Sequence, residues 1–284
     1  MGRLVSVGDT CLNVEERGEG ELAVLALHGG PGLDHTMFGW WLDPIADEHR
    51  LVLVDERAQG RSLPAPAETW TLQQHARDVE ALAAALGLDR YVVLGHSFGA
   101  FIALQHAVDF PGRPAGTIVS SGVPSERYLM PHVEAELARF EPEQLREQVT
   151  ASWEREKGAQ TESDCRALLA DQLPFHIADP RDPRIEDVRT AMVTAVYSPD
   201  VLRSAANEGY GGIEVEDRLK EIRHPVLVLA GRHDRTCSLE AAEAIARGIG
   251  RRANLHIFED AAHLTFVEQA GEYTDTVLEF LARV

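Results

Sequence analysis

The chain has 284 residues, of which 44% are hydrophobic and 26% charged, and this length and balance suit a single domain with an insertion. Its net charge of −19, from 46 acidic and 27 basic residues, disfavours nucleic acid and anionic membrane surfaces as partners, because both are polyanions. Three widely separated cysteines predict reduced thiols, not a disulfide framework. The first residues lack the apolar run of a signal peptide, and no apolar stretch is long enough to span a bilayer, so we expect a cytoplasmic protein.

Apolar runs of strand length alternate with helical patterns in the first part of the chain. The first two segments are typical of a hairpin, and the later, continuous runs are typical of strands buried on both faces of a parallel sheet. Helices are expected over 71–87, where apolar residues recur at helical spacing after Thr71, and over 96–108. The predicted strands are residues 3–7, 11–17, 21–27, 51–55, 91–95 and 116–122.

The end of the chain returns to the same alternation of strands and helices. Residues 226–231 and 254–259 predict two further buried strands, and residues 272–284 predict an amphipathic helix. Strand and helix thus alternate at both ends of the chain, which indicates βαβ units. We therefore predict an α/β fold, with a mostly parallel sheet and helices on both faces.

The middle of the chain, residues 124–218, contains helical stretches but no convincing strand. We interpret it as a helical cap inserted into a catalytic domain that comprises residues 1–123 and 219–284. The reason is that the two late strands are needed to complete the sheet. The alternative is an independent helical domain.

A Gly-x-Ser-x-Gly pentapeptide occupies residues 95–99, between a predicted buried strand and a predicted helix. The pentapeptide is a weak signal by itself, but this strand–turn–helix context is typical of a nucleophile elbow. The sharp turn requires glycines at its crowded positions, and it presents Ser97 at a helix N-terminus that favours developing negative charge. We predict that Ser97 is a nucleophile and that His96 packs beside the turn; the alternative is a glycine-lined turn without chemistry.

A serine hydroxyl needs a base, and chain order selects among the 12 histidines. In this architecture the acid and then the histidine follow the serine. Asp234 comes just after one late strand and His263 just after the other, at the carboxyl ends where open parallel sheets place their sites. We predict His263 as the base and Asp234 as the acid that orients it. Rival residues in the same loops are His233, Glu259 and Asp260.

The tetrahedral intermediate of acyl transfer needs hydrogen-bond donors for its oxyanion. One is expected to be the backbone N–H of Phe98, the residue after the nucleophile. The other is expected from Gly30 in the loop His28–Gly32, where glycines let the backbone approach the substrate. The alternative for this loop is a tight turn without a role in the reaction.

Other chemistries find no support in the motifs. The sequence has no His-Glu-x-x-His pair, no Cys-x-x-Cys pair and no clustered metal ligands. It also lacks a phosphate-binding Gly-x-x-x-x-Gly-Lys-Ser/Thr loop and the third glycine of a dinucleotide fingerprint. We therefore expect neither a metal nor a cofactor. The expected partner is a small-molecule or short-peptide substrate.

On these motifs the sequence resembles the proline iminopeptidase group of α/β-hydrolases, serine aminopeptidases that remove an N-terminal residue, often proline, from short peptides. The resemblance covers both ends of the catalytic domain and is loose in the cap. The matching segments are HGGPG at 28–32, DERAQGRS at 55–62, GHSFG at 95–99, AGRHD at 230–234 and AAHLTFVE at 261–268. HGGPG is the most specific of them.

The resemblance also implies substrate-binding residues, since acidic residues near the cap bind the substrate's amine in this group. Glu208 is our candidate, with Glu214 and Glu216 as rivals. Arg235 stands where the group often has a second glutamate, which would weaken ammonium binding and favour a carboxylate or neutral substrate. Ala58 replaces the group's usual glycine, a minor change in a supporting loop. Further residues predicted at the substrate are Gly29, Trp153 and Tyr210, and other aromatic candidates for an apolar wall are Phe98, Trp40 and Trp41.

Three hypotheses for the function follow. The first is a serine aminopeptidase that cleaves the amide bond after a small N-terminal residue through an acyl-enzyme. The second is a hydrolase of small-molecule esters, lactones or amides in specialised metabolism, which Arg235 favours. The third is a binding protein that retains the fold without activity, and covalent labelling by a fluorophosphonate would exclude it, because only an activated serine reacts.

Overall fold

The computed structural model describes residues 2–284, and its strands form one sheet in the order β1-β2-β4-β3-β5-β6-β7-β8. The two neighbours of β2 pair with it antiparallel, and every other pairing is parallel. The predicted hairpin and the mostly parallel sheet are thereby confirmed. The strands are β1 (Arg3–Ser6), β2 (Cys11–Arg17), β3 (Ala23–Leu27), β4 (Arg50–Val54), β5 (Tyr91–His96), β6 (Gly116–Ser120), β7 (Val226–Gly231) and β8 (Ala253–Phe258).

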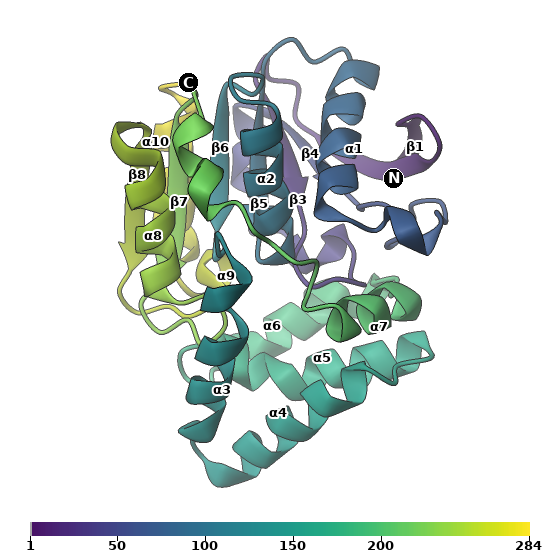
Figure 1. The fold of residues 1–284 in the computed structure, drawn as a ribbon, viewed down its shortest axis with the longest axis vertical. Helices are drawn as coiled ribbons and strands as arrows, with labels where there is room; N and C mark the ends of the chain where they lie inside the picture. Colours follow the sequence, from purple (N-terminus) through teal and green to yellow (C-terminus); the bar gives the residue numbers. More distant parts are fainter. Residues whose placement is uncertain (1) are drawn as a thin grey trace.

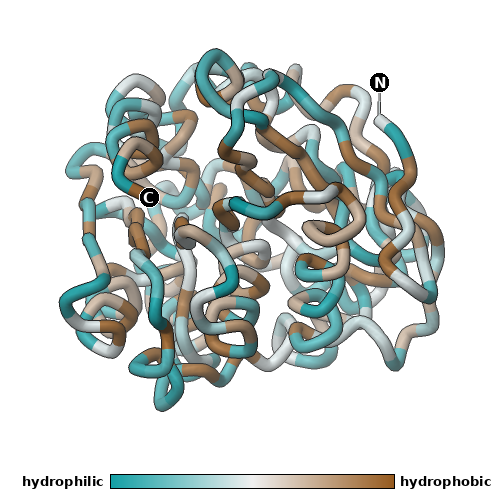
Figure 2. The backbone as a smooth tube through the Cα atoms, turned by 90° about the horizontal axis from the view of Figure 1, so that it is seen from above, coloured by the Kyte–Doolittle hydropathy of each residue, from teal (hydrophilic) through white to brown (hydrophobic). Residues whose placement is uncertain are grey.

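The central strands are apolar throughout because both faces of the sheet are covered. In β3, Leu25 and Leu27 pack into one hydrophobic core, whereas Val24 and Ala26 pack into the other, as the two-residue period of a strand requires. Figure 2 shows hydrophobic stretches of backbone inside the molecule and hydrophilic stretches over many of its outer turns.

Helices lie on both faces, as predicted. On one face α1 (Leu72–Ala85), α2 (Phe98–Asp109) and α8 (Leu239–Ile249) cover the sheet, and α9 (Thr265–Glu268) and α10 (Ala270–Leu281) contribute to the core of the other (Figure 1). Helix α1 begins where Thr71 accepts a hydrogen bond from the Gln74 backbone N–H. Within the described part of the chain, no helix has the length and apolar character needed to cross a bilayer.

The segment between β6 and β7 is helical and lies across one end of the sheet (Figure 1). Its helices are α3 (Met130–Ala138), α4 (Glu143–Glu156), α5 (Glu162–His176), α6 (Arg184–Ala191) and α7 (Pro199–Asn207), and we call this segment the cap. Val133, Phe140 and Phe175 belong to a small core of its own, but Leu168 and Leu173 join the second core of the sheet. This shared core favours an inserted cap over an independent domain; the boundaries at 124 and 218 stay a prediction.

Short 3₁₀ helices occupy many of the connections. They are η1 (His35–Phe38), η2 (Asp43–Asp47), η3 (Ala67–Thr69), η4 (Glu126–Tyr128), η5 (Met192–Thr194), η6 (Glu216–Glu221) and η7 (Gly250–Arg252). The loops that follow β3, β5, β7 and β8 all reach the end of the sheet that the cap covers, because parallel strands place their carboxyl ends at one edge. These four connections contain the predicted catalytic and oxyanion-hole residues, whereas the other predicted substrate residues apart from Gly29 lie in the cap.

Candidate active site

Ser97 lies in the sharp turn between β5 and α2, with φ 54° and ψ −116°. A Cβ atom on Gly95 would lie 2.0 Å from the Gly99 carbonyl oxygen, and one on Gly99 would lie 2.2 Å from the Leu27 carbonyl oxygen. No side chain fits at either position, which explains both glycines of the pentapeptide. The turn places Ser97 in the wall of a mostly apolar pocket, at the N-terminus of α2.

Asp234 follows β7 and His263 follows β8, and the two side chains are in contact. Nδ1 of His263 lies 2.9 Å and 3.1 Å from the two carboxylate oxygens of Asp234. The Oδ1 atom of Asp234 also accepts hydrogen bonds from the backbone N–H groups of Thr236 (2.8 Å) and Cys237 (2.9 Å). Burial acts to raise the pKa of Asp234, but the imidazole and the two N–H donors outweigh it and hold the pKa below its ordinary value. The carboxylate is therefore charged at neutral pH and orients the ring of His263.

Two further histidines flank His263: the buried His96 and the half-buried His176. The ring centroids of His96 and His176 lie 4.9 Å and 5.1 Å from that of His263. Burial lowers the pKa of His176 to about 3 and that of His96 well below its ordinary value. Both neighbours are therefore uncharged at neutral pH, and they hold the His263 ring without adding a second positive charge beside it.

The backbone of the HGGPG loop lies against the serine. A Cβ atom on Gly29 would lie 2.9 Å from Cβ of Ser97, so this approach requires glycine. The next residue, Gly30, lines the pocket together with Ser97 and Phe98. Within residues 2–284 neither the Gly30 N–H nor the Phe98 N–H has a hydrogen-bond acceptor, so both remain available to a ligand.

His28 sets the direction of the Gly30 N–H. Its Nδ1 atom lies 3.0 Å from the Gly29 carbonyl oxygen, and its Nε2 atom forms an ion pair with Glu56, which is also buried. A carbonyl oxygen can only accept a hydrogen bond, so Nδ1 carries a proton and donates it to the Gly29 oxygen. This holds whether the proton between Nε2 and Glu56 lies on the imidazole or on the carboxyl group. The Gly29–Gly30 peptide is trans, so its N–H points away from its C=O. Because His28 holds the Gly29 oxygen on its own side, the Gly30 N–H points away from His28.

The pair His28–Glu56 is therefore expected to matter for catalysis. Replacing both residues together (His28→Leu with Glu56→Leu) avoids a lone buried carboxylate, which would be strongly destabilising. We expect this double variant to lower kcat for a p-nitrophenyl ester by about 10²- to 10³-fold, as for loss of one oxyanion donor, with little change in KM. Glu56→Gln is the control, because an amide N–H can donate to Nε2 and keep Nδ1 as a donor. A folded double variant with wild-type kcat would contradict the role.

The DERAQGRS segment lies beside the HGGPG loop, since its Glu56 pairs with His28. Asp55 accepts hydrogen bonds from His35 Nδ1 (2.6 Å) and from the backbone N–H of Arg61 (2.9 Å). Arg57 is fully buried and pairs with Asp78. Ala58 has φ 59°, a conformation that costs an alanine about 1 kcal/mol, which explains why glycine suits this position. The segment thus has a structural role, as predicted for a supporting loop.

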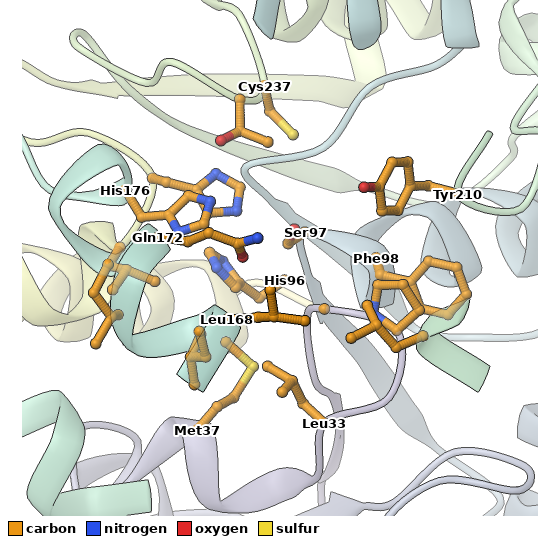
Figure 3. Close-up of a pocket in the computed structure, with 18 of the residues that line it drawn as sticks. Leu33, Met37, His96, Ser97, Phe98, Leu168, Gln172, His176, Tyr210 and Cys237 are labelled. Carbon is orange, nitrogen blue, oxygen red and sulfur yellow. The ribbon is translucent and has the colours of Figure 1, made fainter. Parts of the chain in front are cut away.

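The pocket has a volume of about 150 Å³, close to that of an apolar cavity that holds one benzene molecule. Figure 3 shows Ser97 among its side chains, with Gln172 and His176 on one side and Phe98 and Tyr210 on the other. Most of the wall is apolar. The apolar side chains that line it include Leu33, Met37, Phe98, Phe101, Leu129, Met130, Val133, Trp153, Leu168, Leu173, Met192, Leu264 and Phe266.

One carboxylate from the cap lines this pocket. Glu156, at the end of α4, is buried and accepts hydrogen bonds from Gln172 Nε2 (2.6 Å) and the Tyr210 hydroxyl (2.5 Å). Burial raises the pKa of Glu156 despite these two donors. A charged ligand group placed beside it would meet little competition from solvent.

The structure brings some predicted substrate residues to the pocket and leaves others outside. Trp153 and Tyr210 line it, and Gly29 packs against Ser97. Glu208 does not: it is exposed at the end of α7 and accepts a hydrogen bond from Ser204. The amine-binding role predicted for Glu208 is therefore corrected, because α7 turns this side chain toward solvent.

The rival residues also lie elsewhere. Glu214 and Glu216 bond to Ser125 and Arg127, Glu259 pairs with Arg232, and His233 and Asp260 are exposed. Trp40 is exposed, and Trp41 packs on Phe266 outside the pocket lining.

Sequence reasoning missed Glu156, Gln172 and His176. The signal for Glu156 was present: with Val149, Ser152 and Trp153 it repeats at the spacing of one helical face. Val149 and Ser152 are buried, so an acidic residue on that face must also be buried. A carboxylate on an apolar helical stripe is itself a sign of a site.

One group of potential metal ligands exists within residues 2–284. Ligand atoms of Asp234, Cys237 and His263 lie within 4.8 Å of one another. Asp234 and His263 are already hydrogen-bonded together, and burial raises the pKa of the Cys237 thiol well above its ordinary value. A protonated thiol is a poor metal ligand, so the group suits an acid–imidazole pair better than a metal.

The comparisons with known proteins agree with this geometry. A family model described as alpha/beta hydrolase fold matches residues 23–270. The chain belongs to the alpha/beta hydrolase family. Proline iminopeptidase from Heyndrickxia coagulans is 26% identical over 277 residues, covering 94% of this chain and 92% of that protein. The resemblance to the proline iminopeptidase group is thereby confirmed.

Further relatives of this alpha/beta hydrolase include a hydrolase with another name and a solved structure. The 2-hydroxy-6-oxo-6-phenylhexa-2,4-dienoate hydrolase of Comamonas testosteroni is 27% identical and covers 97% of this chain and 92% of that one. Among solved structures, proline iminopeptidase from Mycobacterium smegmatis has a TM-score of 0.77 at 25% identity, covering 100% of this chain and 98% of that chain. These relatives are named after different substrates, so the comparisons support a hydrolase without selecting among those substrates.

Proposed function

We propose that the protein is a serine hydrolase that works through an acyl-enzyme. Ser97 attacks the carbonyl carbon, and His263, held by Asp234, takes the serine proton and passes it to the leaving group. The N–H groups of Gly30 and Phe98 bind the oxyanion. Water then releases the acyl group by the same route. The observation that supports this proposal is that His263, paired with Asp234, lies in the wall of the same pocket as the strained Ser97.

The first substrate class is an amide with a small N-terminal residue, as for an aminopeptidase. Glu156 supports it, since a buried carboxylate in an apolar pocket lacks a countercharge that a substrate ammonium would provide. The pocket volume suits one small ring or aliphatic side chain, and relatives named proline iminopeptidase support the same class.

Hydrolysis of a small-molecule ester, lactone or amide is the second candidate. The sequence argument for it was Arg235, but Arg235 does not line the pocket. The apolar lining now supports this candidate instead, because it accepts a neutral acyl group without any amine.

A substrate panel separates the two classes. Amino-acyl p-nitroanilides would be measured free and N-acetylated, beside simple p-nitrophenyl esters. Cleavage of free prolyl or alanyl anilides that is lost on acetylation would establish an aminopeptidase. Cleavage of esters alone, with no effect of a free amine, would reject the first class in favour of the second.

Glu156→Gln tests the amine site directly. We expect this variant to raise KM for free amino-acyl anilides by about 10- to 100-fold, because a charge-assisted hydrogen bond contributes about 1.5–3 kcal/mol. Its rate on a neutral p-nitrophenyl ester should stay near wild type. Glu154→Gln is a matched control, since Glu154 is exposed on the same helix. Equal effects of Glu156→Gln on both substrates would contradict amine recognition.

A further inference from the structure

Arg235, which follows Asp234 in the chain, does not line the pocket and instead binds the end of α5. Its guanidinium donates to the carbonyl oxygens of Phe175 (3.1 Å), Ile177 (2.8 Å) and Ala178 (2.9 Å). It also lies over the Phe140 ring, 5.0 Å from the centroid. The last carbonyls of a helix have no partner within the helix, and Arg235 supplies partners from another part of the chain.

The backbone segment that Arg235 binds is itself hydrogen-bonded to the loop that contains His263, the predicted base. The carbonyl oxygen of His176 accepts hydrogen bonds from the backbone N–H groups of His263 (3.0 Å) and Leu264 (3.3 Å). The His176 ring lies against the His263 ring, at an interplanar angle of 35°. The residues on both sides of His176 are therefore anchored by Arg235, and His176 itself contacts both the backbone and the ring of His263.

Glu268 anchors the same segment from the opposite side. One of its carboxylate oxygens accepts the Ala178 backbone N–H (2.7 Å), and the other accepts the Ala262 backbone N–H (2.8 Å). The segment 175–178 is thus held between a guanidinium that binds its carbonyls and a carboxylate that binds its N–H. Ala262 directly precedes His263, so this second contact also reaches the loop of the base.

We propose that Arg235 is a positioning residue for His263, acting through segment 175–178 of the cap. Asp234 holds the imidazole ring of His263 by Nδ1, and its neighbour Arg235 holds the backbone of the same residue through His176. Arg235 therefore sets the alignment of the base with Ser97 instead of selecting a substrate charge. This inference rests on His263 acting as the base, as in the proposed function, but not on the substrate's amine.

The test is Arg235→Met, which keeps an unbranched side chain over Phe140 but removes the three donors. We expect kcat for a p-nitrophenyl ester to fall about 10- to 100-fold, the size typical of a misaligned catalytic group, while KM stays within about threefold. The rate of labelling of Ser97 by a fluorophosphonate should fall in parallel. Arg235→Lys, which can reach part of the same carbonyls, should recover part of both rates. Arg232→Met is the matched control, since Arg232 lies in the same loop but pairs only with the exposed Glu259.

A second readout separates positioning from mere stabilisation. The His263 Nδ1 proton, shared with Asp234, gives a low-field proton resonance that should broaden or shift in Arg235→Met and persist in Arg232→Met. Unchanged kcat, labelling and resonance would overturn the proposal, and so would a raised KM with wild-type kcat, which would place Arg235 at the substrate. If Arg235→Met does not fold, the same comparisons on Arg235→Lys decide. Absence of fluorophosphonate labelling in the wild type would reject the proposed function itself, whatever Arg235 does.

Discussion

Ser97→Ala is expected to lower kcat for ester or anilide hydrolysis by about 10⁶-fold, leaving only the residual catalysis that oxyanion binding and substrate binding supply. The reason is that the thiol of Cys237, which also lines the pocket, cannot replace Ser97, because burial raises its pKa and keeps it protonated. Initial rates at saturating substrate, with active-site labelling of the wild type as the concentration standard, would measure the effect.

The Ser97→Ala protein should keep its fold, because an alanine occupies the same turn without new contacts. Thermal unfolding followed by circular dichroism checks this point. Ser204→Ala is a suitable control, since Ser204 lies on α7 and bonds only to the exposed Glu208. A folded Ser97→Ala enzyme with more than about 1% of wild-type kcat would remove Ser97 from the proposed mechanism.

Asp234→Asn is expected to lower kcat by about 10⁴-fold at neutral pH. The Oδ1 atom of Asp234 is held by two backbone N–H donors, from Thr236 and Cys237, so an asparagine keeps its oxygen there. Its NH₂ group then faces Nδ1 of His263 and donates to it. The imidazole proton moves to Nε2, and the ring can no longer accept the proton of Ser97.

Asp260→Asn is the matched control for Asp234→Asn. Asp260 lies three residues before His263 but is exposed, and it was a rival candidate on sequence grounds. Rates for both variants should be measured from pH 6 to 9 on the same ester. If Asp260→Asn lost activity and Asp234→Asn did not, the acid would have been assigned to the wrong residue.

The sheet and its flanking helices could be predicted because their signals are local. Runs such as residues 91–95 are apolar at every position, which only a strand covered on both faces requires, and the structure confirms each predicted strand. Ser97, Asp234 and His263 could be selected for a related reason, since each lies in the connection that follows such a strand. Chain order and the shared edge of a parallel sheet then place them together.

Residues of the cap could not be assigned in this way. Glu208 and Glu156 both lie near helix ends, and which one faces the pocket depends on how α4, α5 and α7 pack against each other. That packing involves long-range contacts, such as those of Glu156 with Gln172 and Tyr210. The helical spacing of Glu156 indicates that its face is buried, but not that this face meets the pocket. Arg235 failed as a specificity signal for the same reason, because its three acceptors lie about 60 residues away in the chain.

The strained backbone of Ser97 bears on whether the protein is an enzyme or a binding protein. A side-chain-bearing residue at φ 54° and ψ −116° costs about 1–3 kcal/mol, and glycine adopts such angles far more readily. That cost is a sizeable share of the net stability of a typical domain. If only the stability of the fold mattered at this position, glycine would be favoured over serine. The serine at this backbone therefore counts against a binding protein without activity, since such a protein would be more stable with glycine there.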